Sequence, residues 1–189
     1  MRQQFKEKFG QGRYSDYSKR VEKTKMENVE LKNIPTEDLV AIRGYTSDDY
    51  EDLNIALRTQ NAKKLAEFEA YIGCATSGLN QLPSYEGTVF RGTDLPKDVV
   101  PKFVKGAILV ENSFTSTSTL PSKAFGGDTV FIIESISGKD VSKISEYGSE
   151  REVLFPPKTQ FKVINVENDL KSGVRRITMY EVPKNGGTK

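Results

Sequence analysis

The sequence changes character once, after Leu82 and Pro83. Before this point apolar residues recur at the spacing of a helix, and three helices are predicted over residues 35–44, 47–57 and 62–79. After it, short runs rich in β-branched and aromatic residues alternate with turns rich in Gly, Pro and Ser, which is the pattern of strands. Helices first and strands afterwards predict an α+β fold, with segregated helices packed on antiparallel sheets.

Seven strands and one short helix are predicted in the second part of the chain. The strands cover residues 88–91, 108–111, 114–117, 129–134, 152–155, 161–166 and 174–182, and the helix covers residues 98–105. No repeat or linker marks a second domain, so residues 34–185 are predicted to form one domain. Residues 1–33 are polar with an excess of basic residues, which predicts a polar N-terminal extension or helix, with a partner-binding segment as the alternative.

The residue types that the chain lacks restrict its chemistry. It contains no His, which removes Ser-His-Asp and Cys-His catalysis and every His-ligated metal site. Cys74 is the only cysteine and lies in an apolar helical pattern, so it is predicted to be a small buried hydrophobic residue. No glycine-rich phosphate-binding fingerprint follows a predicted strand. Any chemistry must therefore come from Glu, Asp, Arg, Lys, Ser, Thr or Tyr.

Charge and hydropathy exclude two classes of partner. The formal net charge is +2 and no block rich in Lys and Arg occurs, so nucleic acid is not an expected partner. No apolar run approaches the roughly 20 residues that a membrane helix needs, so a membrane is not expected either. The N-terminus lacks the apolar stretch of a secretory signal peptide, so export is expected to depend on another delivery element or on a longer product.

Two carboxylates, Glu150 and Glu152, stand two residues apart where a polar, Gly-containing loop turns into an apolar run. If residues 151–155 form a strand, its period of two sends both carboxylates out of one face and Arg151 out of the other, where a structural role is expected. Neighbouring like charges repel, so folding alone does not favour this arrangement. A solvated pair on an edge strand is the alternative.

Two further polar signatures occur in the strand region. Arg91 ends a predicted strand and is followed by Gly92, which lets a ligand approach the backbone closely. Ser116, Thr117 and Ser118 form a hydroxyl-rich strand with a loop after it. Taken alone each signature is weak, because Arg-Gly is a common strand end and Ser-Thr-Ser often reflects β-propensity and a solvated turn. The three together, in this order, are far more specific.

With this combination the chain resembles the arginine-serine-glutamate class of mono-ADP-ribosyltransferases, best known from bacterial toxins. That class carries an aromatic-Arg-Gly on one strand, Ser-Thr-Ser on a second, and Glu-x-Glu or Gln-x-Glu entering a third. The matches here are residues 90–92, 116–118 and 150–152. Residues 41–46 and 52–54 resemble the helical lead-in of the binary-toxin enzymes, so the resemblance covers about residues 35–182. It implies an ADP-ribosyltransferase-like fold, with N-terminal helices packed on two antiparallel sheets that form a split β-sandwich.

The resemblance implies that NAD+ is the co-substrate and that no metal is required. It places Glu152 against the nicotinamide ribose, where a carboxylate can hydrogen-bond the 2′-hydroxyl and stabilise an oxocarbenium-like state. Ser116 would hydrogen-bond Glu152 and hold its rotamer, and Arg91 would bind a diphosphate oxygen through its planar fork. Gly92 would leave its backbone groups available to the nicotinamide amide.

Four more residues are assigned to NAD+ in the same way: Thr117, Phe125, Asn54 and Tyr50. Phe125, in the loop after Ser-Thr-Ser, is similar to the aromatic residue that many members place against the nicotinamide. The alternative is that it anchors its loop on the core. Asn54 and Tyr50 are predicted to line the same cleft from a helix, with core packing as the alternative.

Glu150 and Tyr147 are assigned to the acceptor. In this class, Glu two residues before the catalytic Glu accompanies arginine acceptors, whereas Gln accompanies asparagine or glutamine acceptors. A carboxylate can pair with a guanidinium and take its proton as attack proceeds. Tyr147 occupies the aromatic position of the target-recognition turn.

The function implied is arginine-specific mono-ADP-ribosyl transfer by a monomeric catalytic domain. We expect a bacterial toxin or effector, secreted or injected, that acts in the cytoplasm of a target cell. Its partners would be a target protein modified on arginine and, in addition, an immunity protein or a fused delivery domain. The alternatives are an NAD+ glycohydrolase that depletes NAD+, and a catalytically dead module that only binds a partner. The intact residues Arg91, Ser116, Glu150 and Glu152 argue against the dead module.

Overall fold

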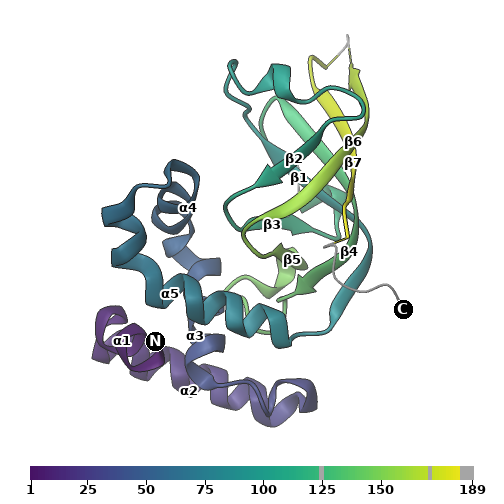
Figure 1. Ribbon diagram of the computed structural model, residues 1–189. Helices are drawn as coiled ribbons and strands as arrows, with labels where there is room; N and C mark the ends of the chain where they lie inside the picture. The colour runs from purple at the N-terminus through teal and green to yellow at the C-terminus, as the bar shows by residue number, and fades with distance from the viewer. Residues whose placement is uncertain (124–125, 170–171, 184–189) are drawn as a thin grey trace. The chain divides into compact units, whose positions relative to one another are not determined.

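The computed structural model describes residues 1–123, 126–169 and 172–183 (Figure 1). The chain divides into two compact units, each treated below by itself. The helical unit comprises residues 1–83 and 139–149, and the sheet unit comprises residues 84–138 and 150–189. No helix in the described part of the chain is long and apolar enough to cross a membrane.

The helical unit contains the three predicted helices and two more before them. Its elements are α1 (Arg2–Phe9), α2 (Gln11–Glu27), the 3-10 helix η1 (Val29–Leu31), α3 (Thr36–Gly44), the π-helical turn η2 (Tyr45–Asp49), α4 (Tyr50–Thr59) and α5 (Ala62–Gln81). The helices predicted over residues 35–44, 47–57 and 62–79 are confirmed as α3, α4 and α5. The gap expected between the first two is itself helical, because η2 carries the helical course from Gly44 to Tyr50.

The polar N-terminal segment forms helices that are packed at a few points. Phe5 and Phe9 of α1 are buried, and their rings lie 5.1 and 5.7 Å from the Tyr71 ring of α5 in edge-on geometry. Arg2 forms a two-pronged ion pair with the buried Asp38 of α3, with N–O distances of 2.9 and 2.8 Å. The segment therefore belongs to the core of the helical unit, even though most of its residues are polar.

Gly44, at the end of α3, leaves room for a polar contact inside this core. A Cβ atom at position 44 would overlap the Tyr71 hydroxyl and lie 2.9 Å from the Phe9 ring. That hydroxyl donates a 2.6 Å hydrogen bond to Asp49, which also pairs with Arg13 at 3.0 Å. Burial and the Asp49 charge raise the pKa of Tyr71 well above its usual value, because both disfavour the phenolate form.

The sheet unit is built from the seven predicted strands. They are β1 (Ser84–Thr93), β2 (Ile108–Glu111), β3 (Thr115–Ser118), β4 (Thr129–Asp140), β5 (Glu152–Phe155), β6 (Thr159–Asn168) and β7 (Arg175–Glu181). The short helix expected over residues 98–105 is a 3-10 turn, η3 (Val100–Lys102). Two further 3-10 turns, η4 (Pro121–Lys123) and η5 (Gly148–Glu150), precede β4 and β5.

The strands join in one sheet with the order β1-β3-β5-β4-β7-β6-β2 and an additional β1–β4 pairing. The expected division into two separate antiparallel sheets is therefore not confirmed. One pair is also parallel: β7 runs alongside β4, with Thr129 opposite Arg175 and Glu134 opposite Tyr180. On its other edge β7 pairs with β6 in the antiparallel sense, from Phe161 opposite Glu181 to Asn168 opposite Arg175. The α+β class itself is confirmed.

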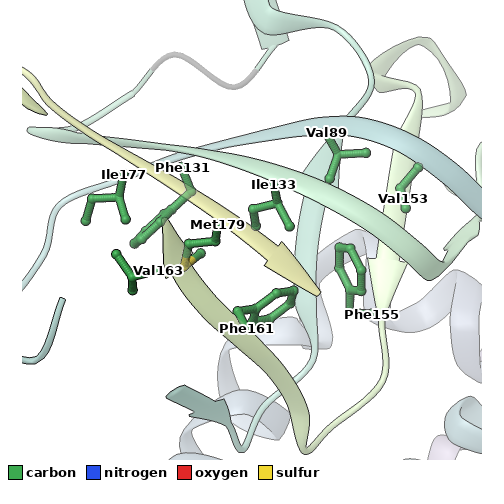
Figure 2. Packing of buried hydrophobic residues seen from close by; sticks show 9 residues of the cluster. All are labelled: Val89, Phe131, Ile133, Val153, Phe155, Phe161, Val163, Ile177 and Met179. Carbon is green, nitrogen blue, oxygen red and sulfur yellow. The ribbon is translucent and has the colours of Figure 1, made fainter. Parts of the chain in front are cut away.

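The core of the sheet unit follows the two-residue period of its strands (Figure 2). Val153 and Phe155 of β5 point to it, as do alternate residues of β4, β6 and β7. The Phe155 and Phe161 rings meet edge to face at 5.2 Å. Every residue of β5 is buried, so the strand that carries Glu152 at its first position is fixed along its whole length.

Substitution of Gly44 by Ala is expected to lower the free energy of unfolding by about 1–3 kcal/mol, the usual cost of forcing atoms into a packed core. The Tyr71 hydroxyl would have to leave Asp49 to make room. Gly12 is the matched control, because it lies within α2 and a Cβ there meets nothing within 4 Å. Gly12→Ala should leave stability unchanged or raise it by up to about 1 kcal/mol. Urea unfolding of both variants tests this, and equal effects would contradict it.

Candidate active site

A pocket of about 280 Å3 on the sheet unit collects the three polar signatures of the sequence. Its lining residues are Phe90, Arg91, Gly92, Ser116, Thr117, Ser118, Lys123, Gly126, Glu150 and Glu152. They come from the end of β1, from β3, from the loop after β3 and from the entry to β5. Residues as far apart in the chain as Phe90 and Glu152 therefore meet at one place, because β3 lies between β1 and β5 in the sheet.

The Glu-x-Glu segment is not the continuous strand that the two-residue period predicted. β5 begins at Glu152, whereas Glu150 ends the 3-10 turn η5. Arg151 between them is exposed and has φ of +52°, a left-handed conformation that is uncommon for a residue with a side chain. The same-face strand is therefore wrong, yet both carboxylates line the pocket.

The last residue of the Ser-Thr-Ser motif holds this backbone in place. Ser118 Oγ donates a 2.6 Å hydrogen bond to the Glu150 carbonyl and accepts one of 3.0 Å from the Leu120 amide. The Thr119 amide donates to the Arg151 carbonyl at 3.1 Å. Ser118 is also the register partner of Glu152. One hydroxyl thus ties the start of the β3 loop to the turn that carries the first carboxylate.

Glu152 is almost fully buried, with 6% of its surface exposed, and shares a face with Ser116. Ser116 pairs with Leu154, two residues along the ladder from the Glu152–Ser118 pair. Diagonal neighbours on one face of an antiparallel pair lie within reach of a Glu side chain. The register therefore places Ser116 suitably to orient Glu152, and that role remains a prediction.

Arg91, in β1, is held by a hydrogen bond to the neighbouring strand β3. Its Nη1 donates a 2.8 Å hydrogen bond to the Ser116 carbonyl, and the adjacent Phe90 is in register with Ser118. Thr117 is held as well, because its hydroxyl donates a 2.6 Å hydrogen bond to the Val153 carbonyl. Thr117 still lines the pocket, so both residues contribute a fixed wall to it.

The loop after β3 returns to the end of β1. Gly127 has φ of +91°, and a Cβ there would overlap the Thr93 carbonyl group, so only Gly fits this approach. The Asp128 amide donates to Asp94 at 2.9 Å, and Asp128 accepts from the Leu95 amide at 3.1 Å. Phe125, predicted to lie against nicotinamide, falls outside the described residues.

Three predicted site residues belong to the helical unit. Asn54 is buried and donates a 3.0 Å hydrogen bond to the Tyr45 hydroxyl, the contact that the core-amide alternative requires. Tyr50 is 45% exposed and its hydroxyl donates to the neighbouring Glu51 at 3.3 Å. Tyr147 is 51% exposed. Their assignment to NAD+ or to the acceptor stays a prediction.

Cys74 takes no part in this chemistry. It has no exposed surface, and burial raises the pKa of its thiol to about 12, so the thiol is protonated at neutral pH. The prediction of a small buried hydrophobic residue is confirmed. Within residues 1–123, 126–169 and 172–183, no group of three or more Cys, Asp or Glu side chains could hold a metal ion.

Two features of the pocket were not predictable from the sequence: the hydrogen bond from Ser118 to Glu150 and the presence of Lys123. Ser118 belongs to the Ser-Thr-Ser motif, but its hydrogen bond to the Glu150 carbonyl depends on the path of a loop that the sequence does not give. Lys123 lines the pocket from η4 and places a positive charge at a site with two carboxylates. No local pattern distinguishes this lysine from other surface lysines.

The fold of this chain matches that of solved ADP-ribosyltransferases and of a bacterial effector. The chain is similar to the crystal structure of the type III effector XopAI from Xanthomonas axonopodis pv. citri, with 32% identity, a TM-score of 0.84, and coverage of 96% of this chain and 82% of XopAI. It is also similar to the ADP-ribosyltransferase Vis from Vibrio splendidus, solved in complex with agmatine, with 26% identity, a TM-score of 0.69, and coverage of 93% and 88%.

The chain belongs to the NAD:arginine ADP-ribosyltransferase family, whose model matches residues 1–185. Among curated relatives, it is 38% identical over 159 residues to the NAD(+)–protein-arginine ADP-ribosyltransferase Tre1 of Serratia proteamaculans. The match covers 82% of this chain and 34% of Tre1, so the chain spans about a third of the length of that relative. The resemblance seen in the sequence motifs is thereby confirmed.

The two outer serines of the Ser-Thr-Ser motif should differ in their effect on stability. Ser118→Ala removes two hydrogen bonds and leaves the Glu150 carbonyl without the hydroxyl, so unfolding should become easier by about 1 kcal/mol or more. Ser116→Ala is the matched control on the same strand and face, and it should cost less. Thermal unfolding of both variants provides the measurement. A larger loss for Ser116→Ala would contradict the tethering role of Ser118.

Proposed function

We propose that this chain transfers ADP-ribose from NAD+ to an arginine of a target protein and releases nicotinamide. The observation that carries the proposal is the single pocket in which Arg91, Ser116, Glu150 and Glu152 meet. Family membership supports the same reaction. The names of Tre1 and Vis support it too, and agmatine, found with Vis, is a small guanidine like the arginine side chain.

Glu152 acts on the donor. In the reaction the bond between nicotinamide and C1′ of its ribose breaks, nicotinamide leaves with the electron pair, and positive charge develops on the ribose. A buried carboxylate stabilises that charge strongly because little water screens it. Ser116 orients this carboxylate, and Arg91 binds the diphosphate as a permanently charged fork. Gly92, Thr117 and the residues Phe125, Asn54 and Tyr50 complete the proposed NAD+ contacts.

Glu150 acts on the acceptor. A guanidinium nitrogen forms the new bond to C1′, and the proton it loses passes to the Glu150 carboxylate. Glu150 is exposed while Glu152 is buried, so the carboxylate nearer to solvent is the one proposed to meet the incoming protein. Tyr147 contacts the target beside it. NAD+ is consumed as co-substrate, and the mechanism needs no metal.

The biological setting is also proposed. XopAI is a type III effector by its description, and a delivered bacterial toxin acting in the cytoplasm of a target cell fits the reaction. A fused delivery domain fits the larger size of Tre1. The chain acts as a monomer, and an immunity protein would block its pocket.

Substitution of Glu152 by Gln removes the charge and keeps the shape of the side chain. We expect nicotinamide release, with or without a guanidine acceptor, to fall by about 10²-fold or more, the effect of losing one preorganised electrostatic group. NAD+ affinity should change little, because Arg91 and Gly92 are intact. Nicotinamide release is measured by chromatography and NAD+ binding by calorimetry. Retention of more than half of the wild-type rate would exclude Glu152 as the catalytic carboxylate.

Glu150→Gln separates the two half-reactions. Transfer to agmatine should be lost, whereas slow hydrolysis of NAD+ by water should persist, because Arg91, Ser116 and Glu152 still form the donor site. The wild type in the same assay distinguishes the alternative function, because an NAD+ glycohydrolase would hydrolyse NAD+ and show little transfer to agmatine. Equal losses of transfer and hydrolysis would assign Glu150 to the donor site. Full retention of transfer would remove it from the acceptor chemistry.

A further inference from the structure

We infer that Arg43 and Glu146 form an internal anchor that positions the acceptor turn, defined here as residues 141–149 with Tyr147 near its end. The inference rests on the proposed function, because it concerns how that function meets its arginine. It assigns a role to Arg43, which lies in the lead-in segment 41–46 and is absent from the pocket. Both residues belong to the helical unit.

Arg43 contacts the acceptor turn at three successive residues. From α3, its Nη1 donates to the Ile144 carbonyl at 3.0 Å and to the Ser145 carbonyl at 3.5 Å. Its Nη2 pairs with Glu146 Oε2 at 2.5 Å. Arg43 is only 9% exposed, so its charge is removed from water and depends on these acceptors. One guanidinium thus holds both the backbone and a side chain of the turn.

Neighbouring residues reinforce the same contact. The Thr46 hydroxyl accepts a 3.2 Å hydrogen bond from the Glu146 amide and donates one of 3.0 Å to the Arg43 carbonyl. Arg20 of α2 reaches the second oxygen of Glu146 at 3.3 Å, although its side chain is 59% exposed. The Glu146 carboxylate is therefore bound by two arginines, one buried and one at the surface, and the pair with the buried Arg43 is the less screened by water.

The acceptor turn has a fixed base and a displayed aromatic side chain. Val141 and Ile144 are buried, and the Tyr147 amide donates to the Ser145 hydroxyl at 3.1 Å. A Cβ at Gly148 would lie 2.7 Å from the Ser142 carbonyl, so the turn closes tightly on itself. Tyr147 nevertheless has 51% of its surface exposed. Rigid support beneath an exposed aromatic residue lowers the entropy lost when that residue binds a partner.

The donor pocket does not share this support. Its polar residues are held by contacts within the sheet unit, such as the bonds from Arg91 to Ser116 and from Ser118 to Glu150. Loosening the anchor should therefore change how the enzyme binds a guanidine acceptor, and should leave NAD+ binding and hydrolysis nearly as they are. A residue with a merely structural role would lower all of these together.

The test uses Glu146→Gln, which removes the charge and keeps the shape. We expect the KM for agmatine, at saturating NAD+, to rise at least fivefold, while the KM for NAD+ and the rate of NAD+ hydrolysis stay within about twofold. Arg43→Lys is the second variant, because a single ammonium cannot reproduce the three contacts of the guanidinium. Arg20→Gln is the matched control at the exposed partner and should change the agmatine KM less than twofold.

A double substitution checks that the two residues act as one device. Because Glu146→Gln and Arg43→Lys disrupt the same contact, their combined effect on the agmatine KM should be smaller than the product of the separate effects. Hydrogen exchange gives a readout independent of activity, and the amides of Glu146 and Tyr147 should exchange faster in either variant. If one variant does not fold, the other supplies both measurements.

Two results would overturn the anchor: unchanged exchange at Glu146 and Tyr147, or a parallel fall of transfer and NAD+ hydrolysis in folded variants. Failure of the proposed function looks different. In that case the wild type would not transfer ADP-ribose to agmatine at all, and the exchange experiment would still decide whether Arg43 and Glu146 hold the turn.

Discussion

The pairing of β3 with β5 is the interaction on which the site depends. It brings the Ser-Thr-Ser motif against the first residues of the strand that carries Glu152. Side chains of β3 donate hydrogen bonds to the backbone of this segment: Thr117 to the Val153 carbonyl within β5, and Ser118 to the Glu150 carbonyl just before it. Because β5 is buried throughout, this pairing fixes a carboxylate in a place where water would otherwise compete for it. The hydroxyl groups of the Ser-Thr-Ser motif therefore also hold the backbone around Glu152 in place.

The order of elements was predictable because each signal was local. Apolar spacing located α3, α4 and α5, and β-branched runs located all seven strands. Sheet order and the parallel β4–β7 pair were not predictable, since they depend on which strands meet over long sequence separations. The packing of α1 was hidden for another reason. Two buried phenylalanines and the ion pair between Arg2 and the buried Asp38 dock α1, and its remaining residues resemble those of a solvated tail.

In the site, too, the sequence predicted which residues take part but not the local geometry of the backbone that carries them. Eight of the ten residues that line the pocket could be named from three motifs, because the proposed reaction needs a carboxylate, a guanidinium and close backbone approach together, whereas Lys123 and Gly126 belong to no motif. The course of the backbone between Glu150 and Glu152 could not be predicted. The two-residue period of side chains holds only for extended backbone, whereas Arg151 has a left-handed conformation. No glycine marks that turn. The conformation persists because the carbonyls on either side, of Glu150 and Arg151, accept hydrogen bonds from the β3 end.

The boundary between the two units of the chain lies directly before Glu150. The acceptor turn belongs to the helical unit, and Glu150 is the first residue of the next segment of the sheet unit. One peptide bond, between Ser149 and Glu150, thus joins the segment proposed to recognise the target to the segment proposed to perform the chemistry. If Arg43 holds the acceptor turn and Ser118 holds the Glu150 segment, a substitution in one unit can alter its own segment without disturbing the other. Target choice then varies through α2, α3 and the acceptor turn, while the donor pocket keeps the residues that NAD+ requires.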